Sequence, residues 1–153
     1  MLARSYPDQN CSIARALEVV GERWTLLVLR DVLFGLRRFD EFRASLGIAT
    51  NVLTARLDRL VTEGLLQRQE YQTRPQRHEY ILTDKGRDLA PALLMLMRWG
   101  DRHYPSPGGP PRLAVHAGCG GALGEDLHCQ RCEGRVDLPD VEFRPAPGAA
   151  PAT

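Results

Sequence analysis

The chain has 153 residues, of which 43% are hydrophobic and 25% charged, and its formal net charge at pH 7 is +1. A chain of this length and composition can form one soluble globular domain with a proper core, together with a small additional segment. The nearly neutral charge excludes a polycation that binds nucleic acid by bulk attraction, so any such binding must come from local basic patches.

The sequence predicts neither a secretion signal nor a membrane span. The first ten residues, MLARSYPDQN, lack the apolar core of a signal peptide, and no stretch approaches the ~20 apolar residues of a membrane helix. We therefore expect a cytoplasmic protein with no membrane partner. In a reducing compartment, the four cysteines favour metal binding or redox chemistry over structural disulfides.

Two helices are predicted after a loose N-terminal arm at residues 1–10. The sequence CSIARALEVV, from Cys11, has the apolar spacing of an amphipathic helix that Gly21 ends. Residues 22–34, ERWTLLVLRDVLF, predict a more apolar helix. The apolar face of the first helix comprises Ile13, Ala16, Leu17 and Val20, and the core candidates of the second are Trp24, Leu27, Val28 and Val32.

Residues 39–63, FDEFRASLGIATNVLTARLDRLVTE, predict two short helices separated by Gly47. We expect Thr50 or Asn51 to cap the second helix with a side-chain oxygen. One side of that helix is small or polar, and its apolar side comprises Val52, Leu53, Leu57 and Leu60. Such a pair predicts a DNA-reading helix-turn-helix, although an ordinary helical hairpin explains these residues equally well.

A basic hairpin is predicted directly after this pair of helices. Beyond Gly64, the sequence LLQRQEY alternates as a strand does, residues 72–77 (QTRPQR) form a basic turn, and HEYILT returns as a second strand. In a winged helix, the second helix enters the major groove while the arginines of the hairpin contact phosphates or the minor groove. The alternative is a solvated hairpin tip, but the adjacent helices favour a mainly α fold with a small β-wing.

Residues 83–104 predict one long helix, with Thr83 or Asp84 as its cap. Its apolar side is larger than a small domain readily hides, so we expect it to form a homodimer interface together with the first helix. This side comprises Leu89, Leu93, Leu96, Met97 and Gly100.

A cysteine-rich β appendage is predicted at residues 112–143, after a linker, PSPGGPP, at residues 105–111. Two paired-ligand turns that close on one ion build a zinc ribbon, and the flanking RLAV and GRVDL are predicted strands. The predicted structural Zn²⁺ ligands are His116, Cys119, Cys129 and Cys132, with His128 as a spare candidate. The alternatives are a disulfide-linked flap and a disordered tail with free thiols.

The remaining sequence contains no enzymatic pattern. A zinc ion with four protein ligands has no open position for a substrate. The H-x-E signature of nucleobase deaminases, a Gly-rich phosphate loop and a G-x-S-x-G elbow are all absent. We therefore predict that the protein is not an enzyme. Residues 144–153 have few large apolar side chains and are predicted to be disordered.

The ordered set of these segments resembles the HxlR-type winged helix-turn-helix transcriptional regulators. The resemblance covers roughly residues 11–104. It implies a homodimeric bacterial regulator that binds double-stranded DNA at a roughly palindromic operator, with a winged-helix DNA-binding and dimerisation domain. The sequences that carry it are Cys11 with ARALEVVGERWTLLVLRD, then GLRRFDEFRASLGIATNVLTARLDRLVTEGLL, the basic hairpin, and EYILTDKGRDLAPALLMLMRWG.

By position, the resemblance also implies roles for single residues. The residues that would face or flank the major groove are Thr50, Asn51, Thr54 and Arg56. Arg74 and Arg77 would be wing contacts and Arg38 a phosphate contact. Because Asp58 repels phosphate, we expect the groove contact to be confined to the first turns of the recognition helix.

Cys11 lies where several thiol-sensing members of this family have a reactive cysteine. Its thiolate would be favoured near a helix N-terminus. The alternative function is therefore a sensor, switched by an oxidant, a metal or a small molecule through Cys11 or the C-terminal appendage. The competing interpretation of Cys11 is a half-buried small residue at the dimer interface.

Overall fold

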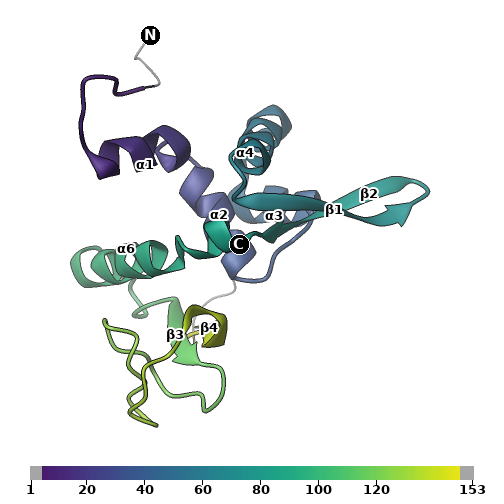
Figure 1. Cartoon of the computed structure of the whole chain (residues 1–153). Coiled ribbons are helices and arrows are strands. Elements are labelled where there is room, and N and C mark those ends of the chain that lie inside the picture. The colour runs from purple at the N-terminus through teal and green to yellow at the C-terminus, as the bar shows by residue number, and fades with distance from the viewer. Residues whose placement is uncertain (1–4, 149–153) are drawn as a thin grey trace. The chain divides into compact units, whose positions relative to one another are not determined.

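Residues 5–148 are described by a computed structural model of the chain (Figure 1). Contacts within the chain separate two units, Met1–Gly86 and Arg87–Thr153. The sequence had suggested a division at the linker, residues 105–111, but the last long helix packs with the cysteine-rich segment. Within the described range, no helix is long and apolar enough to cross a membrane.

The first unit is mainly α with a small β-wing, as predicted. Its core is formed by apolar residues from every element except the wing tip. The elements are α1 Ser12–Val20, α2 Thr25–Leu33, α3 Phe39–Leu46, α4 Thr50–Thr62, β1 Leu66–Thr73 and β2 Gln76–Leu82. The most deeply buried side chains are Val28, Leu29, Phe42, Leu53, Leu57, Leu60, Leu65 and Leu66.

Parts of the first two predicted helices lie outside the core. Trp24 has a left-handed backbone, with a φ of 79°, and α2 begins only after it. Trp24 is therefore half-buried rather than a core residue, and Leu27 is 37% exposed. On α1, Val20 is buried, whereas Ile13 and Leu17 are 70% and 41% exposed, so the described residues leave most of its apolar face uncovered.

The helix pair α3–α4 forms where the sequence predicted it. The Glu41 carboxylate reaches back to the start of α3, where one oxygen accepts hydrogen bonds from the N–H groups of Arg37 and Arg38, both at 2.8 Å. These hydrogen bonds lower the pKa of Glu41. Gly47, with a φ of 61°, ends α3, because a left-handed backbone suits glycine.

The predicted side-chain cap of α4 is wrong. Ala49 occupies the N-cap position, and no side chain of the described residues caps this helix. Thr50 and Asn51 are already the first two helical residues, so their side chains cannot take the capping position. The Thr54 hydroxyl donates to the Thr50 carbonyl, at 2.9 Å.

The wing is a longer hairpin with a tighter turn than predicted. β1 and β2 pair antiparallel from Leu66–Leu82 to Thr73–Gln76, with an irregularity between Glu70 and Gln72. Most of the predicted turn, residues 72–77, therefore belongs to the strands. Figure 1 shows the hairpin as a narrow ribbon that extends away from α3 and α4.

The predicted long helix is broken into α5 Asp84–Arg87 and α6 Ala90–His103. Pro91 has no N–H, and its ring would clash with a helical carbonyl four residues earlier, so the chain cannot continue as one helix through it. Thr83 caps the first piece as predicted: its hydroxyl accepts from the Gly86 N–H at 3.1 Å and donates to the Gly64 carbonyl at 2.5 Å.

The second unit places α6 against a small β structure. β3 Arg112–His116 pairs antiparallel with β4 Val141–Pro145, and the short helix η1 Leu138–Asp140 precedes β4. The predicted strand GRVDL is wrong, because β3 pairs with the later segment instead. β4 also continues into the predicted disordered tail, of which residues 149–153 lie outside the described range. The buried core comprises Leu94, Ala114, Leu123, Cys129 and Val136.

Candidate functional site

The exposed face of α4 carries three of the predicted DNA-binding residues. Thr50, Asn51 and Thr54 are all exposed. They lie within the first five residues of the helix, on a side next to the one that buries the leucines at 53, 57 and 60. This half of α4 therefore presents hydroxyl and amide groups, which can both donate to and accept from base edges.

The acidic residue on this face is neutralised from the wing. Asp58 accepts a hydrogen bond from the Arg68 guanidinium of β1, with 3.2 Å between the charged atoms. The Asp58 carboxylate raises the pKa of Arg68. Repulsion between Asp58 and a phosphate is thereby reduced, and the pair also connects α4 to the wing.

Arg56 lies apart from the other predicted groove residues. Its guanidinium forms an ion pair with Glu22 and donates to the Arg23 carbonyl, at 3.2 Å. Residues 54 and 56 point in different directions because consecutive helical side chains are about 100° apart. Arg56 thus connects α4 to the chain before α2.

The wing and the start of α3 carry exposed arginines. Arg74 and Arg77 are exposed at the tip of the hairpin, and within residues 5–148 neither guanidinium forms an ion pair. The Arg38 guanidinium lies 4.7 Å from the centre of the Tyr71 ring, which joins the start of α3 to β1. Sequence reasoning missed Tyr71, although an exposed aromatic residue inside a basic hairpin was a usable signal.

Cys11 is the N-cap residue of α1. Its thiol is free and half-buried. This position agrees with either interpretation made from the sequence, so the sensor alternative stays a prediction.

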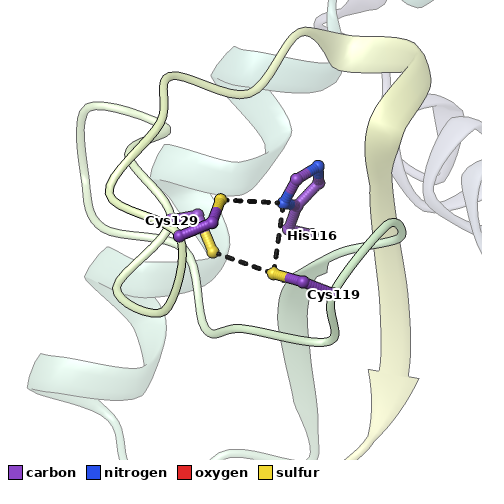
Figure 2. A group of neighbouring side chains, drawn as sticks. His116, Cys119 and Cys129 are labelled. Atoms are coloured by element: carbon purple, nitrogen blue, oxygen red, sulfur yellow. Dashed lines mark hydrogen bonds between the residues drawn. The ribbon is translucent and has the colours of Figure 1, made fainter.

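The four predicted metal ligands converge in the second unit. We call His116, Cys119, Cys129 and Cys132 the Cys/His cluster. Its four ligand atoms all lie within 4.8 Å of one another. The Cys119 sulfur is 3.3 Å from Nδ1 of His116 and 3.4 Å from the Cys129 sulfur, and the Cys132 sulfur is 3.4 Å from the same nitrogen. Figure 2 shows the labelled side chains pointing toward one another.

Backbone N–H groups surround two of the sulfurs. The Cys132 N–H is the main cause that lowers the pKa of Cys129 to about 6, and the Arg131 N–H adds to it from 3.4 Å. The Gly121 N–H favours the Cys119 thiolate, but the neighbouring thiols and burial together outweigh it and raise the pKa of Cys119. The spare candidate His128 lies outside the cluster, with its Nδ1 3.0 Å from the Asp126 carboxylate.

Comparison with known proteins identifies the family of the chain. The HxlR-like helix-turn-helix family matches residues 19–107. The chain belongs to this family. It is also 47% identical to the uncharacterized HTH-type transcriptional regulator Rv3095 of Mycobacterium tuberculosis, over 94% of this chain and 91% of that protein. The protein is therefore a transcriptional regulator of the winged helix-turn-helix type, and not an enzyme.

The solved structures that resemble this chain match different shares of its length. PA1374 from Pseudomonas aeruginosa is 44% identical over 92% of this chain and 95% of its own, with a TM-score of 0.52. The redox regulator HypR, in its reduced form, is 32% identical over 60% of this chain and 92% of its own, with a TM-score of 0.57. A match over 92% of this chain includes most of residues 112–143.

Proposed function

We propose that the protein binds a palindromic DNA operator as a homodimer, with the first turns of α4 in the major groove. The observation that carries this proposal is the exposed polar face formed by Thr50, Asn51 and Thr54. Its side chains are short and uncharged, so they can approach base edges closely. Helices of this type present the N-terminal residues of the recognition helix to the bases.

The arginines outside α4 supply the contacts that do not depend on sequence. Arg74 and Arg77 at the wing tip bind the phosphate backbone or the adjacent minor groove, and Arg38 binds a phosphate beside the start of α3. A guanidinium without an internal ion pair can replace the counterions of the DNA at no cost to the fold. We exclude Arg56 from the interface, because its charge is already paired with Glu22.

The dimer is proposed from two exposed apolar faces. On α1, Ile13 and Leu17 are 70% and 41% exposed, and on α6, Leu96 and Trp99 are 52% and 54% exposed. Exposed apolar side chains that cluster on one helix commonly mark an interface between proteins. An isologous contact between two identical chains places two recognition helices in a twofold arrangement, which matches a palindromic operator.

Selection from a random library of DNA duplexes tests the proposal directly. The full chain, immobilised, should enrich an inverted repeat whose half-sites are separated by about one helical turn, 10–10.5 base pairs, or a multiple of it. Light scattering on the free protein gives the number of chains independently. Enrichment of a single unrepeated motif would contradict the dimer, and absence of any enriched motif would contradict specific DNA binding.

A further inference from the structure

The second unit contains a cluster of His and Cys side chains that the proposed DNA binding does not use. We propose that the Cys/His cluster binds one Zn²⁺ per chain in a closed, structural site. Zinc bonds of about 2.3 Å to sulfur and 2.0–2.1 Å to nitrogen, arranged as a tetrahedron, place neighbouring ligand atoms about 3.6–3.8 Å apart. Three pairs of ligand atoms in the structure are 3.3–3.4 Å apart and all four atoms lie within 4.8 Å of one another, which is close to this arrangement.

The ligand set selects zinc and leaves no open position. Three thiolates and one neutral imidazole are soft and borderline ligands, which suit Zn²⁺ in preference to Mg²⁺ or Ca²⁺. A disulfide needs its two sulfurs at about 2.05 Å, whereas the Cys119 and Cys129 sulfurs are 3.4 Å apart and both share the space with His116. Convergence of four ligand atoms on one centre is explained by a metal and not by one disulfide.

The backbone around the Cys/His cluster lies close to the cysteine sulfurs. A Cβ atom on Gly121 would lie 2.5 Å from the Cys129 sulfur, so no other residue fits there without displacing a ligand. Backbone N–H groups of Gly121, Arg131 and Cys132 point at the sulfurs of Cys119 and Cys129. Such N–H groups orient and stabilise thiolate ligands of a metal.

A cationic side chain balances the charge of the proposed site. Three thiolates and one Zn²⁺ leave one net negative charge. The Arg131 guanidinium donates to the Cys119 carbonyl at 2.6 Å, which holds its positive charge next to the cluster.

The metal also explains how an irregular segment keeps its shape. Residues 117–137 contain no helix or strand beyond isolated bridges, and the core beneath them has only five buried residues. A segment of this kind usually needs a metal or a disulfide to fold. Arg98 of α6 donates to the carbonyls of Leu123 and Gly124, the latter at 2.6 Å. In this proposal zinc fixes the shape of the segment, and the Arg98 hydrogen bonds connect the segment to α6.

The first experiment measures metal on the full chain purified without chelator or added metal. Plasma mass spectrometry should find one zinc per chain. Cobalt(II) added to metal-free protein should give the visible spectrum of a tetrahedral thiolate site. Protein that is folded but contains no zinc, and that binds neither zinc nor cobalt, would overturn the proposal.

Two matched pairs of variants assign the ligands. Cys132→Ser and His116→Asn should weaken zinc binding by more than about 100-fold, since outer-shell substitutions alone cost 10–100-fold. Cys11→Ser and His128→Asn change the same residue types outside the cluster and should retain one zinc. Equal zinc content in all four variants would overturn the assignment.

Thiol titration of the unmodified protein decides the question even if the ligand variants do not fold. With zinc bound, one thiol, that of Cys11, should react rapidly, and chelator should expose the other three. Rapid reaction of all four thiols without chelator, or a disulfide within the cluster, would contradict a closed zinc site. Neither readout involves DNA, so a protein that binds zinc but no operator would refute only the proposed DNA binding.

Discussion

At the scale of single residues, the proposed reading of DNA sequence rests on short polar side chains at the start of α4. Asn51 and Thr54 are exposed, and their neighbours Leu53 and Leu57 are fully buried. The Thr54 hydroxyl gives its proton to the Thr50 carbonyl, which leaves its lone pairs free to accept from a base. The buried leucines fix the direction in which these polar groups point.

We expect Asn51→Ala and Thr54→Ala each to weaken binding to the selected operator by about 1–3 kcal/mol, the usual cost of a lost base contact. Affinity for a random duplex should not change. Fluorescence anisotropy at one salt concentration measures both. Thr62→Ala, at the exposed far end of α4, is the matched control. Unchanged operator affinity in both variants would show that this face does not read bases.

Two arginines of the first unit, Arg74 and Arg56, should behave differently when each is replaced by alanine. Arg74→Ala should weaken binding to all duplexes and reduce the slope of log K against log salt by about 1, because one phosphate contact is lost. Arg56→Ala should leave this slope unchanged and instead lower the free energy of unfolding, since it removes the ion pair between Arg56 and Glu22. Salt titrations and urea unfolding of both variants separate the two roles. A reduced salt slope for Arg56→Ala would return this residue to the interface.

At the scale of elements, the start of α3 depends on one carboxylate. The backbone N–H groups of Arg37 and Arg38 donate to the same oxygen of the Glu41 carboxylate. A glutamine there could still accept both bonds but would carry no charge. The hydrogen bonds and the charge can therefore be tested separately.

We expect Glu41→Ala to lower the free energy of unfolding by about 0.5–2 kcal/mol, the range for a lost helix cap, and Glu41→Gln to lower it less. The folded pKa of Glu41 is below its ordinary value of 4.5. Its contribution is therefore complete above pH 4.5 and is lost as the pH falls through the folded pKa. Urea unfolding at pH 7 and near pH 3 should show a difference between wild type and Glu41→Gln that shrinks in acid. A difference that does not depend on pH would contradict the role of the charge.

The sequence predicted elements well where periodicity and glycine positions agree. The apolar spacing in α4 and the left-handed glycine at position 47 placed the helix pair correctly. Local composition misplaced the wing turn, because the strands continue through residues that favour turns. It also missed the break before α6, where Pro91 forbids a continuous helix although the apolar residues continue.

Long-range contacts account for the rest of what the sequence did not predict. The partner of β3 is Val141–Pro145 rather than GRVDL, and only the folded chain shows this pairing. The pairing of Arg56 with Glu22 likewise joins residues far apart in the sequence. The Cys/His cluster was predictable, because metal ligands follow short spacing rules that do not depend on the rest of the fold.

At the scale of the whole molecule, a net charge of +1 limits how strongly the chain attracts DNA. A few local arginines then supply the phosphate contacts, and a single copy with so few contacts binds weakly. Two linked copies overcome this limit, because the second half-site is bound at a high effective concentration. In the proposed complex, operator affinity therefore depends most on dimerisation.

We expect Ile13→Glu on α1 and Leu96→Glu on α6 each to convert the dimer to a monomer. A carboxylate buried in an apolar contact without a partner costs about 3–5 kcal/mol, which is a change of about 100-fold or more in the dimer dissociation constant. Light scattering across a dilution series measures this change. Leu113→Glu, at a leucine that is 37% exposed on β3, is the control and should stay dimeric.

The same variants connect assembly to DNA binding. A monomer keeps the polar face of α4, so its affinity for an isolated half-site should equal that of the wild type. Its affinity for the full palindrome should fall by about 10²–10⁴-fold, because the gain from linking two half-sites is lost. If the monomeric variants bound the full palindrome as tightly as the wild type, each chain would act alone, and the twofold arrangement of recognition helices would be wrong.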